Sequence, residues 1–87
     1  MLDKQTVLSR LSEEVRKIAV LDDEIPQSAF SEDLLLSGTI DSFGVIQFVS
    51  FVERTFGIRI SEEDQFDERI RSIDGMAEFL LERKARP

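Results

Sequence analysis

The sequence predicts an all-α fold in which three helices and one shorter helix surround a single core. Three segments place apolar residues at steps of three and four, which is the period of an amphipathic helix with one buried face. The only alternating apolar stretch, at residues 58–60, has no second candidate strand to pair with. A chain of 87 residues with 41% hydrophobic content is long enough for one small core and too short for two. We therefore expect one domain over residues 1–87. Its helices are predicted at about 2–20, 42–56, 62–68 and 73–84.

The first helix is predicted from Leu2 to about Val20. Its apolar stripe consists of Val7, Leu8, Leu11, Val15, Ile18 and Ala19, with charged residues between them. The acidic run at 22–24 and Pro26 should end this helix. Negative charge is unfavourable at a helix C-terminus, and the residue before a proline avoids helical geometry.

A long loop follows the first helix, from Leu21 to Asp41, and we expect it to be ordered. It holds too many apolar residues for a solvated linker, namely Ile25, Phe30, Leu34, Leu35 and Leu36. We expect the loop to pack across the helices, with one short turn at residues 31–34. Gly38 is expected to supply a backbone conformation that other residues resist.

The helix predicted from Ser42 to Phe56 has two apolar faces. The core stripe consists of Val45, Phe48, Val49, Val52 and Phe56, and Gly57 is a natural C-terminal cap. A second face, near Ser42, holds Phe43, Ile46, Gln47 and Ser50. Exposed Phe and Ile side chains next to each other would indicate a docking patch. In the alternative interpretation, Phe43 packs under the preceding loop and only Ile46 is partly exposed.

Two more caps organise the C-terminal third of the chain. Ser61 and Asp64 have the spacing of an N-capping pair and predict a short helix with Phe66 and Ile70 as buried anchors. Ser72 should cap the last helix. The apolar stripe of that helix consists of Ile73, Met76, Ala77, Leu80 and Leu81, and its basic end of Arg83, Lys84 and Arg86.

Composition excludes several classes of function. The formal charge of -7 disfavours nucleic acid and anionic membranes as partners and suits a partner with a basic surface. No apolar run approaches the roughly 20 residues that span a bilayer, and residues 1–5 lack a signal-like apolar region, so we expect a cytoplasmic location without membrane insertion. The absence of cysteine excludes disulfides and thiolate-based zinc sites, and we expect no metal site.

The junction between the loop and the second helix is the strongest candidate for a functional site. Asp41 is a good N-cap, so Ser42 would be the first helical residue, with its hydroxyl beside unpaired backbone N–H groups. Such a place stabilises a phosphate. The chain has no histidine, the commonest general base, so a hydrolase with Ser42 as its nucleophile is disfavoured.

The stretch LLLSGTIDSFG, residues 34–44, resembles the phosphopantetheine attachment region of acyl carrier proteins and of the related peptidyl and D-alanyl carrier proteins. The resemblance covers nearly the whole chain, and its most specific part is the Gly-x-x-Asp-Ser element that ends at Ser42. It implies an all-helical bundle of the acyl-carrier type. It also implies that a phosphopantetheinyl transferase, using coenzyme A and magnesium, attaches 4′-phosphopantetheine to Ser42. Asp41 would cap the helix and contact the metal ion of the transferase.

Two departures from the family pattern bear on partners. Phe43 stands where family members usually have leucine or methionine, and the helix lacks the acidity of the fatty-acid carriers. We therefore expect docking through apolar contacts of Phe43 and Ile46, with Gln47 and Ser50 beside them, more than through a basic patch on the partner.

The resemblance implies a free-standing, monomeric carrier that is not itself an enzyme. Its partners would be the transferase, an acyl- or aminoacyl-activating ligase and downstream acyl-transfer enzymes of a lipid, polyketide, peptide or glycan-modification pathway. The alternative hypothesis is a non-catalytic helical interaction module that has the carrier fold but no functional modification of Ser42.

Overall fold

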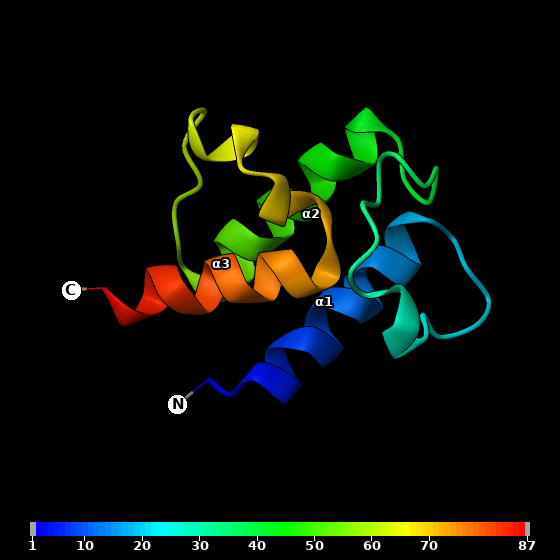
Figure 1. Ribbon diagram of the computed structural model, residues 1–87, viewed down its shortest axis with the longest axis horizontal. Coiled ribbons are helices and arrows are strands. Elements are labelled where there is room, and N and C mark those ends of the chain that lie inside the picture. Colours follow the sequence, from blue (N-terminus) through cyan, green and yellow to red (C-terminus); the bar gives the residue numbers. More distant parts are fainter. Residues whose placement is uncertain (1, 87) are drawn as a thin grey trace.

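The computed structural model describes residues 2–86 and is all-helical over that range, with no strand, as predicted (Figure 1). Its three α-helices are α1 (Lys4–Ile18), α2 (Ser42–Phe56) and α3 (Ile73–Ala85). Its 3-10 helices are η1 (Gln27–Ala29), η2 (Asp64–Phe66) and η3 (Glu68–Arg71). None of the helices in the described range is long and apolar enough to cross a membrane.

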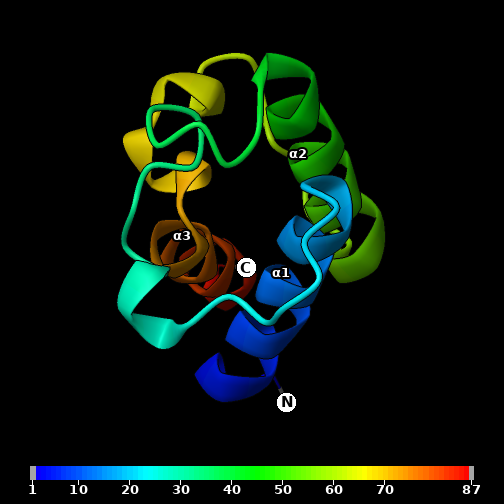
Figure 2. The ribbon, with the colours of Figure 1, turned by 90° about the vertical axis from the view of Figure 1, so that its right-hand side faces the viewer.

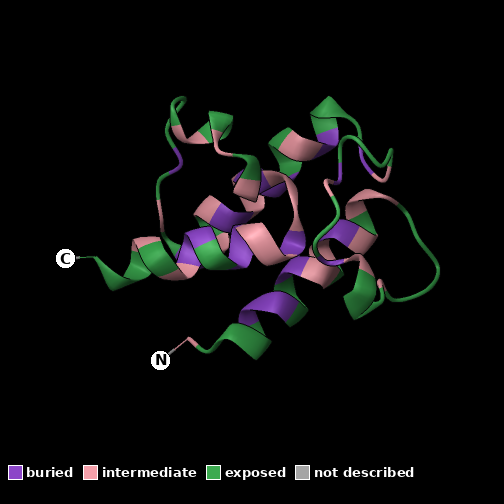
Figure 3. Ribbon diagram, viewed as in Figure 1, coloured by how far each residue is buried: buried purple, intermediate pink, exposed green. Residues whose placement is uncertain are grey.

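The three α-helices enclose one core, and α1 contacts both α2 and α3 (Figures 1 and 2). Buried positions lie on the helix sides that face other helices (Figure 3). The largest side chains that are almost fully buried are Phe48, Leu11, Ile70, Ile73, Met76 and Leu80. Each contributes about 1.5–3 kcal/mol through burial, so these contacts dominate the packing of the helices.

Each α-helix begins at a polar cap whose side chain accepts the backbone N–H of the residue three positions along. The caps are Asp3, Asp41 and Ser72, with donor–acceptor distances of 2.8, 2.8 and 2.9 Å. The predictions for Asp41 and Ser72 are thus confirmed. A cap of this type stabilises a helix by about 1 kcal/mol, so it helps to define where each helix starts.

The C-terminal ends of α1 and α2 are each followed by a residue in the left-handed region. Gly57 follows α2 with a φ of 68°, as predicted for a C-terminal cap. α1 ends at Ile18, before the predicted boundary near residue 20, because Val20 adopts a φ of 54° and reverses the chain. The reversal is closed by two bonds, from Val20 N–H to the Lys17 carbonyl (3.2 Å) and from Leu21 N–H to the Arg16 carbonyl (3.0 Å).

The short helix predicted at residues 62–68 is not one continuous helix. Ser61 and Asp64 do cap each other, since each backbone N–H donates to the other side chain, at 2.9 and 3.1 Å. The turn then stops at Asp67, whose backbone is extended, and η3 starts afresh. The interruption leaves Phe66 86% exposed, so its prediction as a buried anchor is wrong, whereas Ile70 is buried as predicted.

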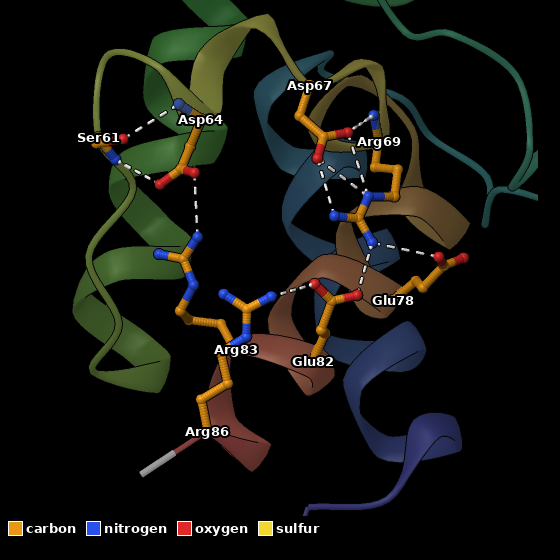
Figure 4. A network of polar contacts seen from close by, with 8 residues as sticks. All are labelled: Ser61, Asp64, Asp67, Arg69, Glu78, Glu82, Arg83 and Arg86. Atoms are coloured by element: carbon orange, nitrogen blue, oxygen red, sulfur yellow. Dashed lines mark hydrogen bonds and ion pairs between the residues drawn. The ribbon is translucent and has the colours of Figure 1, made fainter.

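Arginine side chains fasten η2 and η3 to α3 (Figure 4). Arg83 binds Asp64 at 3.0 Å, and Arg69 binds Asp67 at 2.9 Å and Glu82 at 3.1 Å. Both guanidinium groups also lie over the Phe79 ring, 4.8 Å (Arg83) and 5.5 Å (Arg69) from its centroid. The segment between α2 and α3 is therefore held in one arrangement although it contains no α-helix.

The loop between α1 and α2 is anchored by three buried side chains, Phe30, Leu34 and Ile40. Its helical turn is η1, earlier than the predicted turn at residues 31–34. Two backbone bonds join the loop to the C-terminal third of the chain: the Asp74 N–H donates to the Phe30 carbonyl (2.9 Å) and the Leu34 N–H to the Arg71 carbonyl (2.7 Å). The expectation of packing is wrong for Leu35 and Leu36, which are 37% and 82% exposed.

Candidate functional site

Ser42 is the first residue of α2, and its side chain is exposed. Asp41 precedes it in an extended conformation and accepts two N–H groups, that of Gly44 on its carboxylate (2.8 Å) and that of Val45 on its carbonyl (3.0 Å). The N–H groups of Ser42 and Phe43 find no acceptor within residues 2–86. A hydroxyl therefore lies at a helix start where two free N–H groups and the helix dipole favour negative charge.

The first turn of α2 packs so closely that position 44 has no room for a side chain. A Cβ atom on Gly44 would lie 2.8 Å from Ile40 Cβ and 3.2 Å from Ile18 Cγ2. The end of α1 and the residue next to Asp41 thus support the start of α2. The sequence motif predicts no packing role for Gly44. The available signal was a glycine in the first turn of a helix. Glycine lowers helix stability by about 1 kcal/mol relative to alanine, so its presence there indicates that packing requires a small residue.

Asp33 organises the turn that leads to Ser42. Its Oδ1 accepts the N–H groups of Leu35 and Leu36, both at 2.9 Å, and its Oδ2 accepts Nε of Arg71 at 2.9 Å. Burial raises the pKa of Asp33, but the Leu36 N–H and the Arg71 guanidinium outweigh it, and the pKa lies below its ordinary value. The carboxylate is charged at neutral pH and holds the loop to η3. This role cannot be predicted from local sequence patterns, because the partner, Arg71, is 38 residues away.

A shallow depression of about 410 Å³ adjoins the start of α2. It is formed by the end of α1, the end of the loop and the first turns of α2. Its lining residues are Ile18, Ala19, Gly38, Thr39, Ile40, Asp41, Phe43, Gly44 and Gln47. Gly38 has a φ of 79°, as its prediction required, and brings the loop round to this place.

Phe43 and Ile46 are 66% and 59% exposed. The interpretation in which Phe43 packs under the preceding loop is therefore wrong. The reason is the helical period, because Gly44 and Phe48 take the inward positions and turn Phe43 outward. Gln47 is also exposed, whereas Ser50, one turn further along, is only partly so.

The charge on α2 is low. Its one carboxylate, Glu53, accepts the Ile60 N–H at 3.0 Å near the far end of the helix, and Arg54 is next to it. The acidity of the chain thus resides outside α2. The exposed residues of α2 that follow Ser42, namely Phe43, Ile46 and Gln47, carry no charge.

Comparison with known proteins identifies one family. A family model described as the phosphopantetheine attachment site matches residues 9–80. The matched range contains the whole of α2 and every residue that lines the depression. No curated protein and no solved structure matches the chain.

Proposed function

The chain belongs to the acyl carrier protein family, whose members carry covalently attached 4′-phosphopantetheine, and we propose that Ser42 is the residue that bears this group. The observation that carries the proposal is the place of the Ser42 hydroxyl. Among the serines of residues 2–86, Ser42 alone is the first residue of an α-helix, and its side chain is exposed. The two free N–H groups beside it fit the phosphodiester that would link the group to the chain.

When bound, the group supplies a flexible arm whose terminal thiol holds the cargo. The chain's own residues hold the root of the arm. The N–H groups of Ser42 and Phe43 stabilise the phosphate charge, and Asp41 keeps them oriented through its bond to Gly44. Asp41 Oδ2, which has no hydrogen-bond partner within residues 2–86, would be free to contact the metal ion of the transferase. Since the chain has no histidine, the transferase supplies the base for Ser42.

Phe43, Ile46, Gln47 and Ser50 form the docking surface of this carrier. Support comes from the exposure of the first three and from the low charge on α2. An exposed aromatic residue beside an aliphatic one can fill an apolar pocket on a partner. The partners are the phosphopantetheinyl transferase, an acyl- or aminoacyl-activating ligase and downstream acyl-transfer enzymes.

In this role residues 1–87 are one monomeric carrier domain that presents a thioester-linked acyl or aminoacyl intermediate and performs no chemistry of its own. Segment 61–71 takes the position of a short third helix in a four-helix bundle. The pathway is one of lipid, polyketide, peptide or glycan modification, in the cytoplasm.

Intact mass after incubation with a broad-specificity phosphopantetheinyl transferase, coenzyme A and Mg²⁺ tests the attachment. We expect the addition of one phosphopantetheine group to the wild type and to Ser9→Ala, a control at an exposed serine of α1, and none to Ser42→Ala. Because the chain has no cysteine, a thiol-reactive dye should label only the modified protein. An unchanged wild-type mass, or addition that persists in Ser42→Ala, contradicts the proposal.

A second candidate function is that of an interaction module without modification of Ser42. The only observation that favours it is the exposure of Phe43 and Ile46. The two functions separate in cells that depend on the protein. If the protein is a carrier, Ser42→Ala should abolish its function. If it is an interaction module, Phe43→Ala should abolish its function and Ser42→Ala should leave it intact.

A further inference from the structure

Two contacts clamp the loop before Ser42 to η3. The Arg71 side chain donates to Asp33 Oδ2 at 2.9 Å, and the Arg71 carbonyl accepts the Leu34 N–H at 2.7 Å. One residue of η3 thus binds two consecutive residues of the loop, by side chain and by backbone. We refer to these contacts as the Asp33/Arg71 clamp. Both charged side chains are about three quarters buried, with exposed fractions of 26% for Arg71 and 23% for Asp33.

A continuous series of contacts leads from the clamp to the first turn of α2. The carbonyl of Leu34 accepts the Ile40 N–H at 3.1 Å, which closes the turn that Asp33 caps. Ile40 is buried and lies so close to Gly44 that no Cβ fits between them. A shift of Leu34 therefore displaces Ile40, and with it the support under the start of α2.

We propose that Asp33 and Arg71 are positioning residues, which hold the loop and the start of α2 in the conformation that the transferase binds. This inference rests on the proposed function of Ser42. Neither residue bonds to Ser42, so their effect passes through the loop. Without the clamp the loop opens locally, and only a fraction of molecules present Ser42 correctly. The apparent affinity of the transferase falls by that fraction, so KM rises, whereas kcat of the bound complex stays the same.

The chain contains a matched control for this clamp. Asp64 and Arg83 form a second carboxylate–guanidinium pair, at 3.0 Å, with exposed fractions of 22% and 29% (Figure 4). This pair joins η2 to α3 and makes no contact with the loop before Ser42. Asp64→Asn should therefore weaken the fold about as much as Asp33→Asn does, without affecting the presentation of Ser42.

Steady-state kinetics of a broad-specificity transferase with coenzyme A test the inference. The substrates are the full chain and its Asp33→Asn, Arg71→Gln, Arg71→Lys and Asp64→Asn variants, at a temperature at which circular dichroism shows each of them folded. We expect KM for the chain to rise about five- to tenfold in Asp33→Asn and Arg71→Gln, with kcat within about twofold. Asp64→Asn should match the wild type, and Arg71→Lys should recover part of the loss seen in Arg71→Gln, because lysine keeps the positive charge opposite Asp33.

Amide hydrogen exchange gives a readout that does not depend on the transferase. Asp33→Asn should speed exchange at Ile40, Gly44 and Val45, and Asp64→Asn should leave these amides unchanged. Equal KM values for Asp33→Asn and Asp64→Asn, or unchanged exchange at the three amides in Asp33→Asn, overturn the positioning role alone. A wild-type chain that accepts no phosphopantetheine overturns the proposed function, and the positioning role with it.

Discussion

At the scale of single residues, Val20 has a strained backbone conformation. It is the one non-glycine residue with a positive φ within residues 2–86, and its β-branched side chain is 85% exposed. A left-handed conformation costs a branched residue about 1–2 kcal/mol. The strain is retained because the two bonds of the chain reversal after α1 require this conformation.

We expect Val20→Gly to raise the free energy of unfolding by about 1 kcal/mol, because relief of strain exceeds the added entropy of the unfolded chain. Urea unfolding measures the change. Gly57→Ala is the reverse control: its φ is 68° and open space surrounds its Cβ position, so only the backbone term acts, and it should destabilise by about 1 kcal/mol. A destabilised Val20→Gly protein would show that Val20 is not strained.

Gly44 occupies a position of the site at which no larger residue fits. We expect Gly44→Ala to destabilise by about 1 kcal/mol net, because the clash with Ile40 and Ile18 outweighs the gain in helix propensity. Urea unfolding should show a lower free energy of unfolding, and the transferase assay should show less efficient modification. The control Gln47→Ala lies exposed on the same helix and gains propensity without a clash, so its stability should be unchanged or slightly higher. Equal stability of the two variants would contradict the close packing.

At the scale of the element, α2 combines a buried face with an exposed apolar face beside Ser42. Only the exposed face can be altered without loss of stability, because its side chains bury little area. This separation allows docking to be tested apart from folding.

We expect Phe43→Ala to raise KM of the transferase about tenfold and to leave the urea midpoint unchanged, since Phe43 is 66% exposed. Because α2 contributes little charge, KM of the wild type should change less than about threefold between low and high salt. The matched control is Phe66→Ala, an exposed phenylalanine on η2, whose KM should equal that of the wild type. A steep rise of KM with salt would instead indicate a charged docking surface.

The segment from η2 to η3 behaves differently at its two apolar positions. Ile70 is buried and Phe66 is exposed, so we expect Ile70→Ala to cost about 2–5 kcal/mol and Phe66→Ala less than about 0.5 kcal/mol. Urea unfolding of both variants checks the contrast. A large loss in Phe66→Ala would mean that the phenylalanine is covered in solution.

At the scale of the whole molecule, carboxylate and arginine pairs link segments far apart in sequence. The Arg83 guanidinium, with the Ser61 N–H, lowers the pKa of Asp64, and the Arg69 guanidinium lowers the pKa of Asp67. The pKa of Asp33 is lowered as well, although burial of its carboxyl group acts to raise it. All three carboxyl groups start from an ordinary value of 3.8.

A depressed pKa in the folded state stabilises the fold above the unfolded pKa, and this stabilisation is lost as the pH falls through the folded value. We therefore expect the free energy of unfolding to stay nearly constant from pH 7 to about pH 5 and to fall below about pH 4. Relief of the repulsion behind the net charge of -7 opposes this loss, so the urea titration belongs at moderate salt, where that repulsion is screened. Asp64→Asn should reduce the acid-induced loss, and an unchanged pH profile in that variant would contradict the assignment.

The amino-acid sequence by itself determined the helices and the motif. The apolar periods of α1, α2 and α3, the caps Asp41 and Ser72 and the C-cap Gly57 were all predicted. Each of these features depends on contacts within about four positions, and such contacts can be read along the chain. The Gly-x-x-Asp-Ser element at the start of α2 belongs to the same group, since its geometry comes from a helix cap.

The tertiary structure decided the features that join distant residues. Phe66 is exposed because the turn of η2 stops at Asp67, an interruption that periodicity cannot reveal in so short a segment. Asp33 meets Arg71 across 38 positions, and Gly44 meets Ile18 from another helix. The pattern along the chain does not encode such pairs, because packing and ion pairing depend on how the helices come together in space. Local sequence patterns therefore located the candidate site at Ser42, and the tertiary structure determined which distant residues hold the start of α2 in place.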